Sequence, residues 1–141
     1  MKIKKPQLEN PIFCAIDTPS LQKAISLGNN IKFSVGGIKV GLEFFSSNGP
    51  QGVAKLSNLL KLPIFLDLKF HDIPNTVEKG LEALVKMKPL FTTIHIAGGD
   101  DMMQVSRLIK KKTKILGVSI LTSIDKKQTI KYYNQKNISA L

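Results

Sequence analysis

The 141-residue sequence contains no tryptophan, one cysteine, one arginine and no long apolar run. The single cysteine, Cys14, excludes an internal disulfide, and we expect a small buried side chain in a strand. The apolar runs are far shorter than the roughly 20 residues of a membrane-spanning helix. No apolar segment of signal-peptide length follows the basic start at residues 1–6. The sequence therefore predicts a cytoplasmic protein without a membrane partner.

Positive charge is abundant, but it is almost entirely lysine. The formal net charge is +11, and Arg107 is the only arginine. The lysines are scattered along the chain, without the interleaved aromatic residues that stack on bases. We therefore expect no nucleic-acid partner. A solvated lysine-rich surface accounts for the charge, and its field would also favour a small anionic substrate.

The chain repeats one theme, in which a short apolar run is followed by a turn and then by a helical pattern. The predicted strands are residues 12–16, 37–40, 64–68, 93–96 and 115–121. The predicted helices are residues 20–27, 52–60, 76–87, 102–110 and 128–133. Alternating strands and helices predict an α/β fold with parallel strands and right-handed crossovers.

Two architectures fit this pattern. The length suits one domain, but five βα units are too few for a closed (β/α)8 barrel, which takes about 250 residues. The chain could form a doubly wound sheet or the first part of a barrel. A doubly wound nucleotide-binding sheet usually has a glycine-rich loop after its first strand. Residues 17–20 contain no glycine there, which favours the barrel.

Residues 67–76, DLKFHDIPNT, place two acids and a lysine within six positions, directly after the apolar residues 62–66. Isolated charges are costly to bury, so charges at the end of an apolar strand need a reason. Asp67 and Lys69 are two residues apart and should point to the same face of a strand. Asp72 lies beyond the strand end and can point elsewhere.

Part of this motif should also have a local structural role. Pro74 restricts Ile73 to extended backbone and so fixes how the chain leaves the strand. Asn75 is predicted to cap the following helix, with Glu78 bonding back in a variant of the capping box.

Polar residues stand at the end of every predicted strand. They are Asp17, Lys39, Asp67 with Lys69, His95, and Thr122 with Ser123. The carboxyl ends of the strands of a parallel barrel converge on one site. We therefore expect these side chains to lie close together. Among the polar residues of this region, His71, His95 and Glu43 are expected to have structural roles.

At these residues the sequence resembles the orotidine 5′-phosphate decarboxylase family. Residues 65–77, FLDLKFHDIPNTV, are similar to the signature of its bacterial form. Residues 15–17, 39–43, 95–99 and 117–123 resemble its successive strand ends, so the resemblance covers about residues 12–123. Sibling barrels that act on sugar phosphates share Asp-x-Lys-x-x-Asp but lack the Ile-Pro-Asn-Thr continuation. The resemblance implies a (β/α)8 TIM barrel truncated to about its first five βα units, with residues 1–141 forming a single partial barrel domain.

The resemblance also implies a function, which is the decarboxylation of orotidine 5′-phosphate to UMP in pyrimidine biosynthesis. This carbon–carbon lyase needs no metal or other cofactor. Lys39, Asp67, Lys69 and Asp72 would form a catalytic row of alternating charge, with Lys69 protonating the C6 carbanion. Asp72 would serve the neighbouring subunit, so the working unit would be a homodimer.

The substrate would be bound by side chains from the strand ends and from the motif. These would be Asp17, Lys39, Asp67, Ile73, Thr76 and Thr122. Of them, Asp17, Lys39 and Thr76 would hold the ribose hydroxyls, with Thr76 reaching across the dimer. Thr122, with Ser123 beside it, would contact the pyrimidine.

The family grips the substrate phosphate with a glutamine and an arginine from later strands. Those strands would follow residue 141, and Arg107 lies in a predicted helix and cannot take that part. We therefore expect these 141 residues alone to have little or no activity. Two alternatives remain open: a sibling metal-dependent sugar-phosphate decarboxylase or aldolase, and a non-catalytic fragment.

Overall fold

A computed structural model of the chain describes residues 10–107, 109 and 112–134. The first elements are β1 (Phe13–Ala15), α1 (Leu21–Ile31), β2 (Gly37–Gly41), α2 (Leu42–Leu60), β3 (Ile64–Phe70) and α3 (Pro74–Leu84). They are followed by η1 (Val85–Met87), β4 (Phe91–His95), η2 (Ile96–Gly98), α4 (Gly99–Arg107), β5 (Lys114–Val118) and α5 (Lys126–Tyr133). All five predicted strands and all five predicted helices are present, although the end predicted for the helix over 102–110 lies partly outside the described residues.

The five strands are parallel and lie in the order β1-β2-β3-β4-β5. A doubly wound sheet reverses its strand order at a switch point. The described strands have no such reversal, and consecutive neighbours are the arrangement of a (β/α)8 barrel. The topology thus decides between the two architectures that the sequence leaves open, in favour of the barrel.

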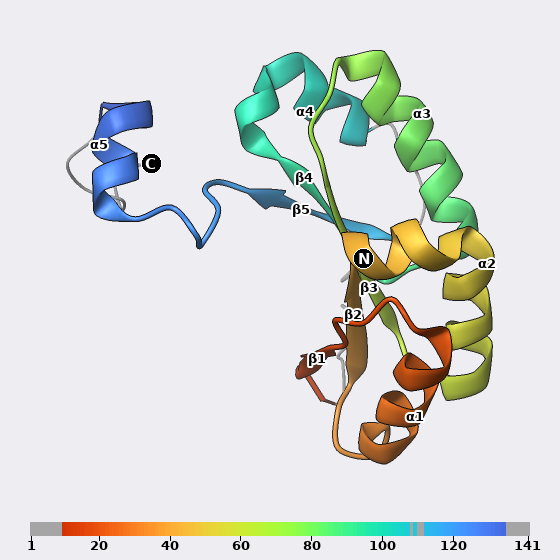
Figure 1. The fold of residues 1–141 in the computed structure, drawn as a ribbon. Coiled ribbons are helices and arrows are strands. Elements are labelled where there is room, and N and C mark those ends of the chain that lie inside the picture. The colour runs from red at the N-terminus through yellow and green to blue at the C-terminus, as the bar shows by residue number, and fades with distance from the viewer. Residues whose placement is uncertain (1–9, 108, 110–111, 135–141) are drawn as a thin grey trace, which may run out of the picture.

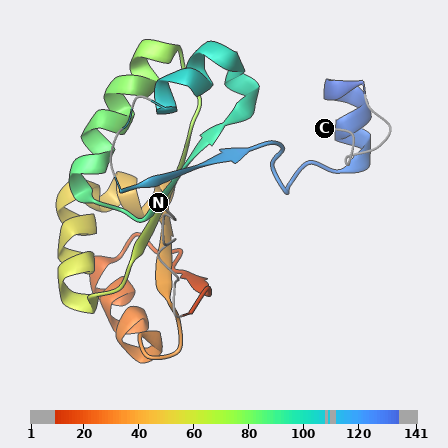
Figure 2. The ribbon, with the colours of Figure 1, turned by 180° about the vertical axis from the view of Figure 1, so that it is seen from behind.

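One face of the sheet carries the main hydrophobic core. Ile38 and Val40 of β2 and Ile64 and Leu66 of β3 are at most 4% exposed and pack with apolar residues of α1 and α2. Figures 1 and 2 show α1, α2 and α3 along this side of the sheet. Each fully buried aliphatic side chain contributes roughly 1.5–3 kcal/mol, so this face anchors the strands that carry the site.

The opposite face is lined by aromatic rings toward the amino ends of the strands. Phe13, Phe65 and Phe91 are neighbours across the sheet, with ring centroids 5.4–6.3 Å apart in edge-to-face geometry. Side chains two positions further along a strand point to the same face. Asp67 and Thr93 therefore stand directly after Phe65 and Phe91, so a polar layer follows the aromatic layer toward the carboxyl ends.

The second helix begins ten residues earlier than predicted. α2 starts at Leu42 and bends at Gly49, whose φ is 60°, before Pro50 continues the helix. A proline removes one helical hydrogen bond and clashes with the preceding turn, which explains a bend at this point. Glu43, predicted as a packing or loop carboxylate, lies exposed in the first turn of α2.

The predicted cap of α3 is wrong. The N-cap is Ile73, Pro74 is the first helical residue, and no side chain caps the helix there. Proline suits the first helical position because its φ is already helical and its missing N–H needs no partner. The helix therefore starts two residues too early for Asn75 to act as its cap.

The last element, α5, lies apart from the sheet and follows a connecting segment after β5 (Figures 1 and 2). It starts two residues before the prediction because Asp125 and Gln128 form a capping box. Cys14 is half-buried in β1 rather than fully buried. Within the described ranges, no helix is long and apolar enough to cross a membrane.

Candidate active site

Asp67 is the centre of a cluster of polar side chains on the uncovered face. It is only 9% exposed, and its Oδ2 lies 2.8 Å from Nζ of Lys69 and 3.5 Å from Nζ of Lys39. The hydroxyl of Thr93 donates to the other carboxylate oxygen, Oδ1, at 2.8 Å. The structure therefore brings together Lys39, Asp67 and Lys69, as the sequence predicts, and adds Thr93.

The cluster keeps the Asp67 carboxyl ionised. Burial by itself raises the pKa of Asp67. Hydrogen bonds from Lys69 and Thr93, together with the charges of Lys69 and Lys39, outweigh burial and hold the pKa below its ordinary value. Two ammonium groups thus face one carboxylate, which leaves the site with a local excess of positive charge.

Lys69 has an unusual backbone conformation. Its φ is 48°, in the left-handed region that non-glycine residues rarely adopt. The pairing of β3 with β4 is irregular here, because Leu66 pairs with Thr92 while Phe70 pairs with Ile94. A bulge of this kind redirects side chains, and strained backbone of this kind concentrates at functional sites.

Thr93 is a site residue that sequence reasoning missed. It is buried in β4, accepts a hydrogen bond from the Lys69 backbone N–H at 2.9 Å and donates one to Asp67. Threonine is common in strands, so its presence in β4 carries no signal by itself. Its position two residues before His95, on the same face of the predicted strand 93–96, was the available clue.

The two histidines of the chain lie together beside Lys69. The ring centroids of His71 and His95 are 5.1 Å apart, and the ring planes are tilted by 36°. Burial, the neighbouring His71 and the charge of Lys69 all lower the pKa of His95. A neutral His95 is therefore favoured next to the lysine, and the pair packs at the end of β3 and β4.

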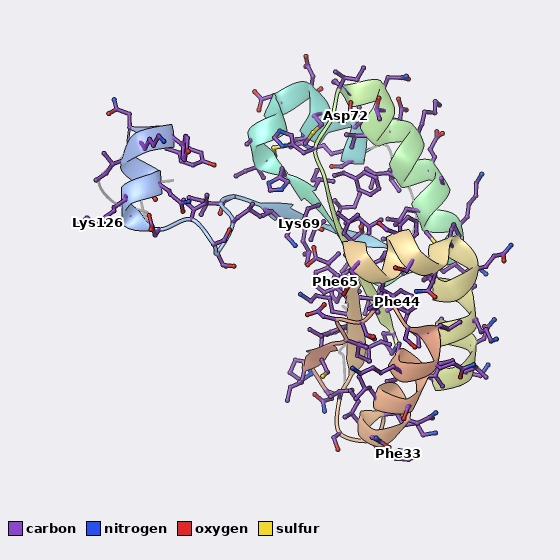
Figure 3. All side chains as sticks on the ribbon, viewed as in Figure 1. Phe33, Phe44, Phe65, Lys69, Asp72 and Lys126 are labelled. Atoms are coloured by element: carbon purple, nitrogen blue, oxygen red, sulfur yellow. The ribbon has the colours of Figure 1, made fainter. Side chains whose placement is uncertain are left out.

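The sequence also predicts Asp17, Asp72, Ile73 and Thr76 as site residues. Asp17 stands at the end of β1, where its Oδ1 is 4.0 Å from the position a Cβ would take on Gly41 of β2. Asp72 and Thr76 are exposed, and Ile73 is 66% exposed (Figure 3 shows Asp72 in the segment between Lys69 and α3).

Thr122 and Ser123 are exposed in the segment between β5 and α5. Among the described residues, no hydrogen bond or ion pair joins either of them to the Asp67 cluster. The structure therefore does not bring the predicted pyrimidine contact to the charged side chains.

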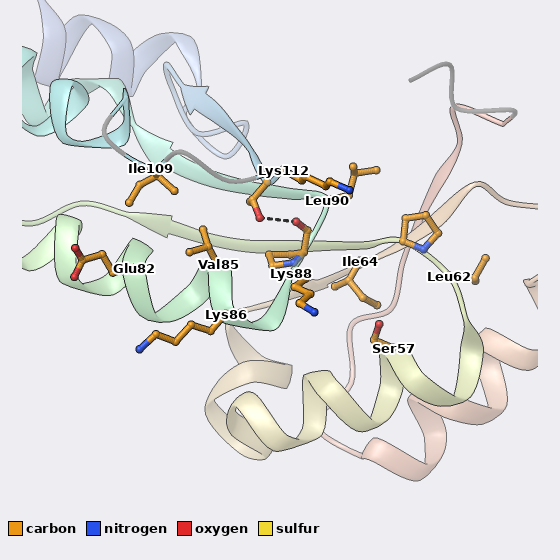
Figure 4. A pocket seen from close by; sticks show the side chains of 13 residues that line it. Ser57, Leu62, Ile64, Glu82, Val85, Lys86, Lys88, Leu90, Ile109 and Lys112 are labelled. Atoms are coloured by element: carbon orange, nitrogen blue, oxygen red, sulfur yellow. Dashed lines mark hydrogen bonds between the residues drawn. The ribbon is translucent and has the colours of Figure 1, made fainter. Parts of the chain in front are cut away.

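Two cavities lie at opposite ends of the strands. One of about 500 Å³ lies between α2 and α3 and is lined by Lys69, His71, Asp72 and Thr76 together with apolar side chains. A larger one, of about 1100 Å³, is lined by residues that begin or precede strands, such as Ile64, Leu90 and Thr113 (Figure 4). Barrel enzymes place their chemistry at the carboxyl ends. Lys69 lines the smaller cavity, but Lys39, Asp67 and Thr93 line neither cavity, since the smaller one lies among helices on the other face of the sheet.

The described part of the chain contains no cluster of side chains suited to bind a metal ion. No group of three or more His, Cys, Asp or Glu side chains there could hold a metal ion. Asp67 is the one carboxylate of the cluster, and the lysines on either side of it occupy its Oδ2. The chemistry that this cluster can offer is electrostatic stabilisation and proton transfer.

The fold and the cluster define a class, that of βα-barrel proteins with a lysine–aspartate pair at the end of the third strand. The chain belongs to the orotidine 5′-phosphate decarboxylase / HUMPS family, whose model matches residues 10–140. It is 47% identical over 119 residues to an orotidine 5′-phosphate decarboxylase of Sphingopyxis alaskensis, covering 84% of this chain and 53% of that protein. One from Wolbachia of Brugia malayi is 50% identical over 117 residues, covering 82% and 52%.

Solved structures show a similar fold. The orotidine 5′-phosphate decarboxylase of Lactobacillus acidophilus superimposes with a TM-score of 0.72 at 33% identity, over 89% of this chain and 59% of that one. An uncharacterised protein of Geobacillus kaustophilus gives a TM-score of 0.77 at 29% identity, over 90% and 62%. The chain therefore spans about half the length of the curated relatives it matches, and its five βα units correspond to part of a TIM barrel.

Proposed function

We propose that this chain supplies the catalytic lysine–aspartate pair for decarboxylation of orotidine 5′-phosphate to UMP in pyrimidine biosynthesis. The observation that carries the proposal is the Lys69 ammonium 2.8 Å from the buried Asp67 carboxylate, at the carboxyl end of a barrel strand. The similarity to curated decarboxylases supports the same reaction.

The reaction breaks the bond between C6 of the pyrimidine and its carboxylate carbon. The bonding electron pair stays on C6 as CO2 leaves. Lys69 stabilises that negative charge and then transfers a proton from Nζ to C6, so that UMP is formed without a redox step. Lys39, 3.5 Å from Asp67, helps to keep that carboxylate ionised and in place.

Electrostatic stabilisation by Lys69 can supply part of the lowering of the activation free energy. A unit charge pair about 4 Å apart is worth on the order of 4 kcal/mol at an effective dielectric constant of about 20. The donors are fixed before the charge develops, so little reorganisation is needed during the reaction. Asp67 would also repel the substrate carboxylate, and that repulsion ends when CO2 departs.

The proposal includes a homodimer in which Asp72 and Thr76 serve the partner's site. Both side chains are exposed, and Ile73 between them is 66% exposed. Leu42, at the start of α2, is 63% exposed and lines the same cavity as Asp72. Exposed apolar side chains next to functional polar ones are typical of an interface.

The remaining parts of the proposal concern the substrate, the domain and the location. Asp17 and Lys39 would bind the ribose, Ile73 would line the site, and Thr122 would reach the pyrimidine only after the segment following β5 moves toward the strand ends. Residues 1–141 would form one partial barrel domain. A cytoplasmic location fits because a charged nucleotide does not cross a membrane unaided.

The substrate test uses a fusion in which this chain replaces the matched part of the S. alaskensis relative. We expect the fusion to consume orotidine 5′-phosphate, followed by ultraviolet absorbance, without added metal. The 141-residue chain alone should show little turnover, because binding energy from the remote phosphate drives chemistry at the reacting centre.

The competing function gives a different result. A sibling sugar-phosphate decarboxylase or aldolase would leave orotidine 5′-phosphate untouched and would convert a keto sugar phosphate only with Mg²⁺. Ordinary turnover by the chain alone would contradict the expected dependence on the remainder of a barrel. A well-folded fusion that is inactive on both substrates would favour a non-catalytic role.

A further inference from the structure

The hydroxyl of Thr93 links the two charged residues of the pair by a route separate from their ion pair. It accepts the Lys69 backbone N–H at 2.9 Å and lies 2.8 Å from Asp67 Oδ1. A hydroxyl has one proton to donate. Because the Lys69 contact uses the oxygen as an acceptor, that proton is available to the carboxylate, and the hydrogen bonds run in one direction, from Lys69 through Thr93 to Asp67.

This arrangement follows from the bulge in β3. Four residue steps from Leu66 to Phe70 face two steps from Thr92 to Ile94 on β4, so the regular ladder is interrupted around Lys69. The Thr93 side chain provides the acceptor for the Lys69 N–H at this interruption. The left-handed φ of Lys69 is thus held by a hydrogen bond from a neighbouring strand.

The same hydroxyl fixes the rotation of the Asp67 carboxylate. Oδ2 faces the ammonium groups of Lys69 and Lys39, and Oδ1 faces Thr93. With both oxygens bound by different partners, the carboxylate cannot turn about its Cβ–Cγ bond without breaking a hydrogen bond. Thr93 is itself 4% exposed, so water has little access to replace its hydroxyl.

We infer that Thr93 is a positioning residue for this site, which sets the Lys69 backbone and the Asp67 carboxylate in one fixed relation. The inference rests on the proposed function for its purpose. A substrate carboxylate placed beside Asp67 would push that side chain away, and Thr93 holds it in place against this repulsion. Positioned donors lose rate when they can relax, since displacement of the reacting groups by about 1 Å can cost about 100-fold.

The chain offers a matched control in the adjacent residue of the same strand. Thr92 is fully buried, and its Oγ1 is the one buried side-chain oxygen or nitrogen that lacks a hydrogen-bond partner in the described part of the chain. Thr92→Val and Thr93→Val each delete one hydroxyl group, at neighbouring buried positions of β4. Thr93→Ser keeps the hydroxyl and removes only the methyl group.

The test is a carbon-13 NMR titration of the Asp67 carboxyl in the 141-residue chain, with the Lys69 amide signal recorded in the same samples. In Thr93→Val we expect a raised Asp67 pKa and a shifted Lys69 amide signal, because both hydrogen bonds to that hydroxyl are lost. Thr92→Val and Thr93→Ser should stay close to the unmodified chain. An Asp67 titration in Thr93→Val that matches Thr92→Val would overturn the inference.

If Thr93→Val does not fold, the exchange rate of the Thr93 hydroxyl proton in the unmodified chain tests the inference instead. A slowly exchanging Thr93 hydroxyl proton close to Asp67 would support the inference, and a freely exchanging one would overturn it. In the fusion used for the substrate test, Thr93→Val should lower kcat about tenfold or more with KM little changed. The NMR titration needs no turnover, so failure of this inference is distinguishable from failure of the proposed function.

Discussion

Asp67 and Lys69 could be identified from the sequence because charged residues two apart after an apolar run are rarely accidental. The pattern predicted that they face the same side, and their ion pair at 2.8 Å confirms it. The left-handed backbone of Lys69 could not be predicted, since nothing in the local sequence marks a non-glycine residue for that conformation. It depends on Thr93, which is distant in sequence and reaches the site only through the pairing of β3 with β4.

His95 provides a prediction about pH at the residue scale. Burial, His71 and the Lys69 charge lower the pKa of His95 below its ordinary value of 6.5. The unfolded chain therefore takes up a proton at a higher pH than the folded chain does. The free energy of unfolding should decrease as the pH falls below about 6.5 and continue to decrease until the folded-state pKa is passed.

Urea unfolding of the 141-residue chain at several pH values between 7.5 and 5 would measure this effect. His95→Gln should remove most of the dependence in that range. The Asp67 carboxylate acts in a separate, lower range, because the pKa of Asp67 lies below its ordinary value of 3.8 and its stabilisation is lost only as the pH falls through that lowered pKa. A pH dependence unchanged in His95→Gln would contradict this account of the histidine.

At the scale of the elements, strands could be predicted more accurately than helix ends. Strands such as Ile64–Phe70 are marked by short apolar runs, which must be covered wherever the sheet is placed. The start of α2 at Leu42 was missed because Gly49 and Pro50 suggest a break, whereas the helix bends there and continues. The start of α3 was misplaced because the proline itself begins the helix.

Gly37 of β2 shows how one strand position supports the aromatic layer. A Cβ there would collide with the Phe13 ring and would lie 2.7 Å from the Pro63 carbonyl oxygen. Gly37→Ala should therefore lower the free energy of unfolding by about 1–3 kcal/mol. Urea unfolding measures the change.

Gly41→Ala is the matched control in the same strand. The nearest atoms to a Cβ at Gly41 are 4.0 Å away, which is ordinary van der Waals contact. This variant should change stability by no more than roughly 0.5 kcal/mol. Equal losses in the two variants would contradict the close packing of Phe13 over β2.

At the scale of the whole molecule, the strand order and the relatives' lengths place the described sheet within a larger barrel. The five strands are consecutive neighbours, and the chain spans about half of the curated proteins it matches. Phe13, Phe65 and Phe91 lie on the face that points to the interior when such a sheet closes. The (β/α)8 class could be predicted from the sequence through its resemblance to a family, whereas spacing alone left a doubly wound sheet possible.

The proposed decarboxylation depends on Lys69 as the group that stabilises and protonates C6. The most direct measurement is the rate of orotidine 5′-phosphate decarboxylation by the fusion with the S. alaskensis relative, compared between Lys69→Met and Lys79→Met. Lys79 is an exposed lysine on α3 that pairs with Glu82 at 3.2 Å. We expect Lys69→Met to lower kcat at least about 100- to 1000-fold, the range seen when a donor that stabilises developing negative charge is removed. Lys79→Met should stay within about twofold, and similar rates for the two folded variants would contradict the claim.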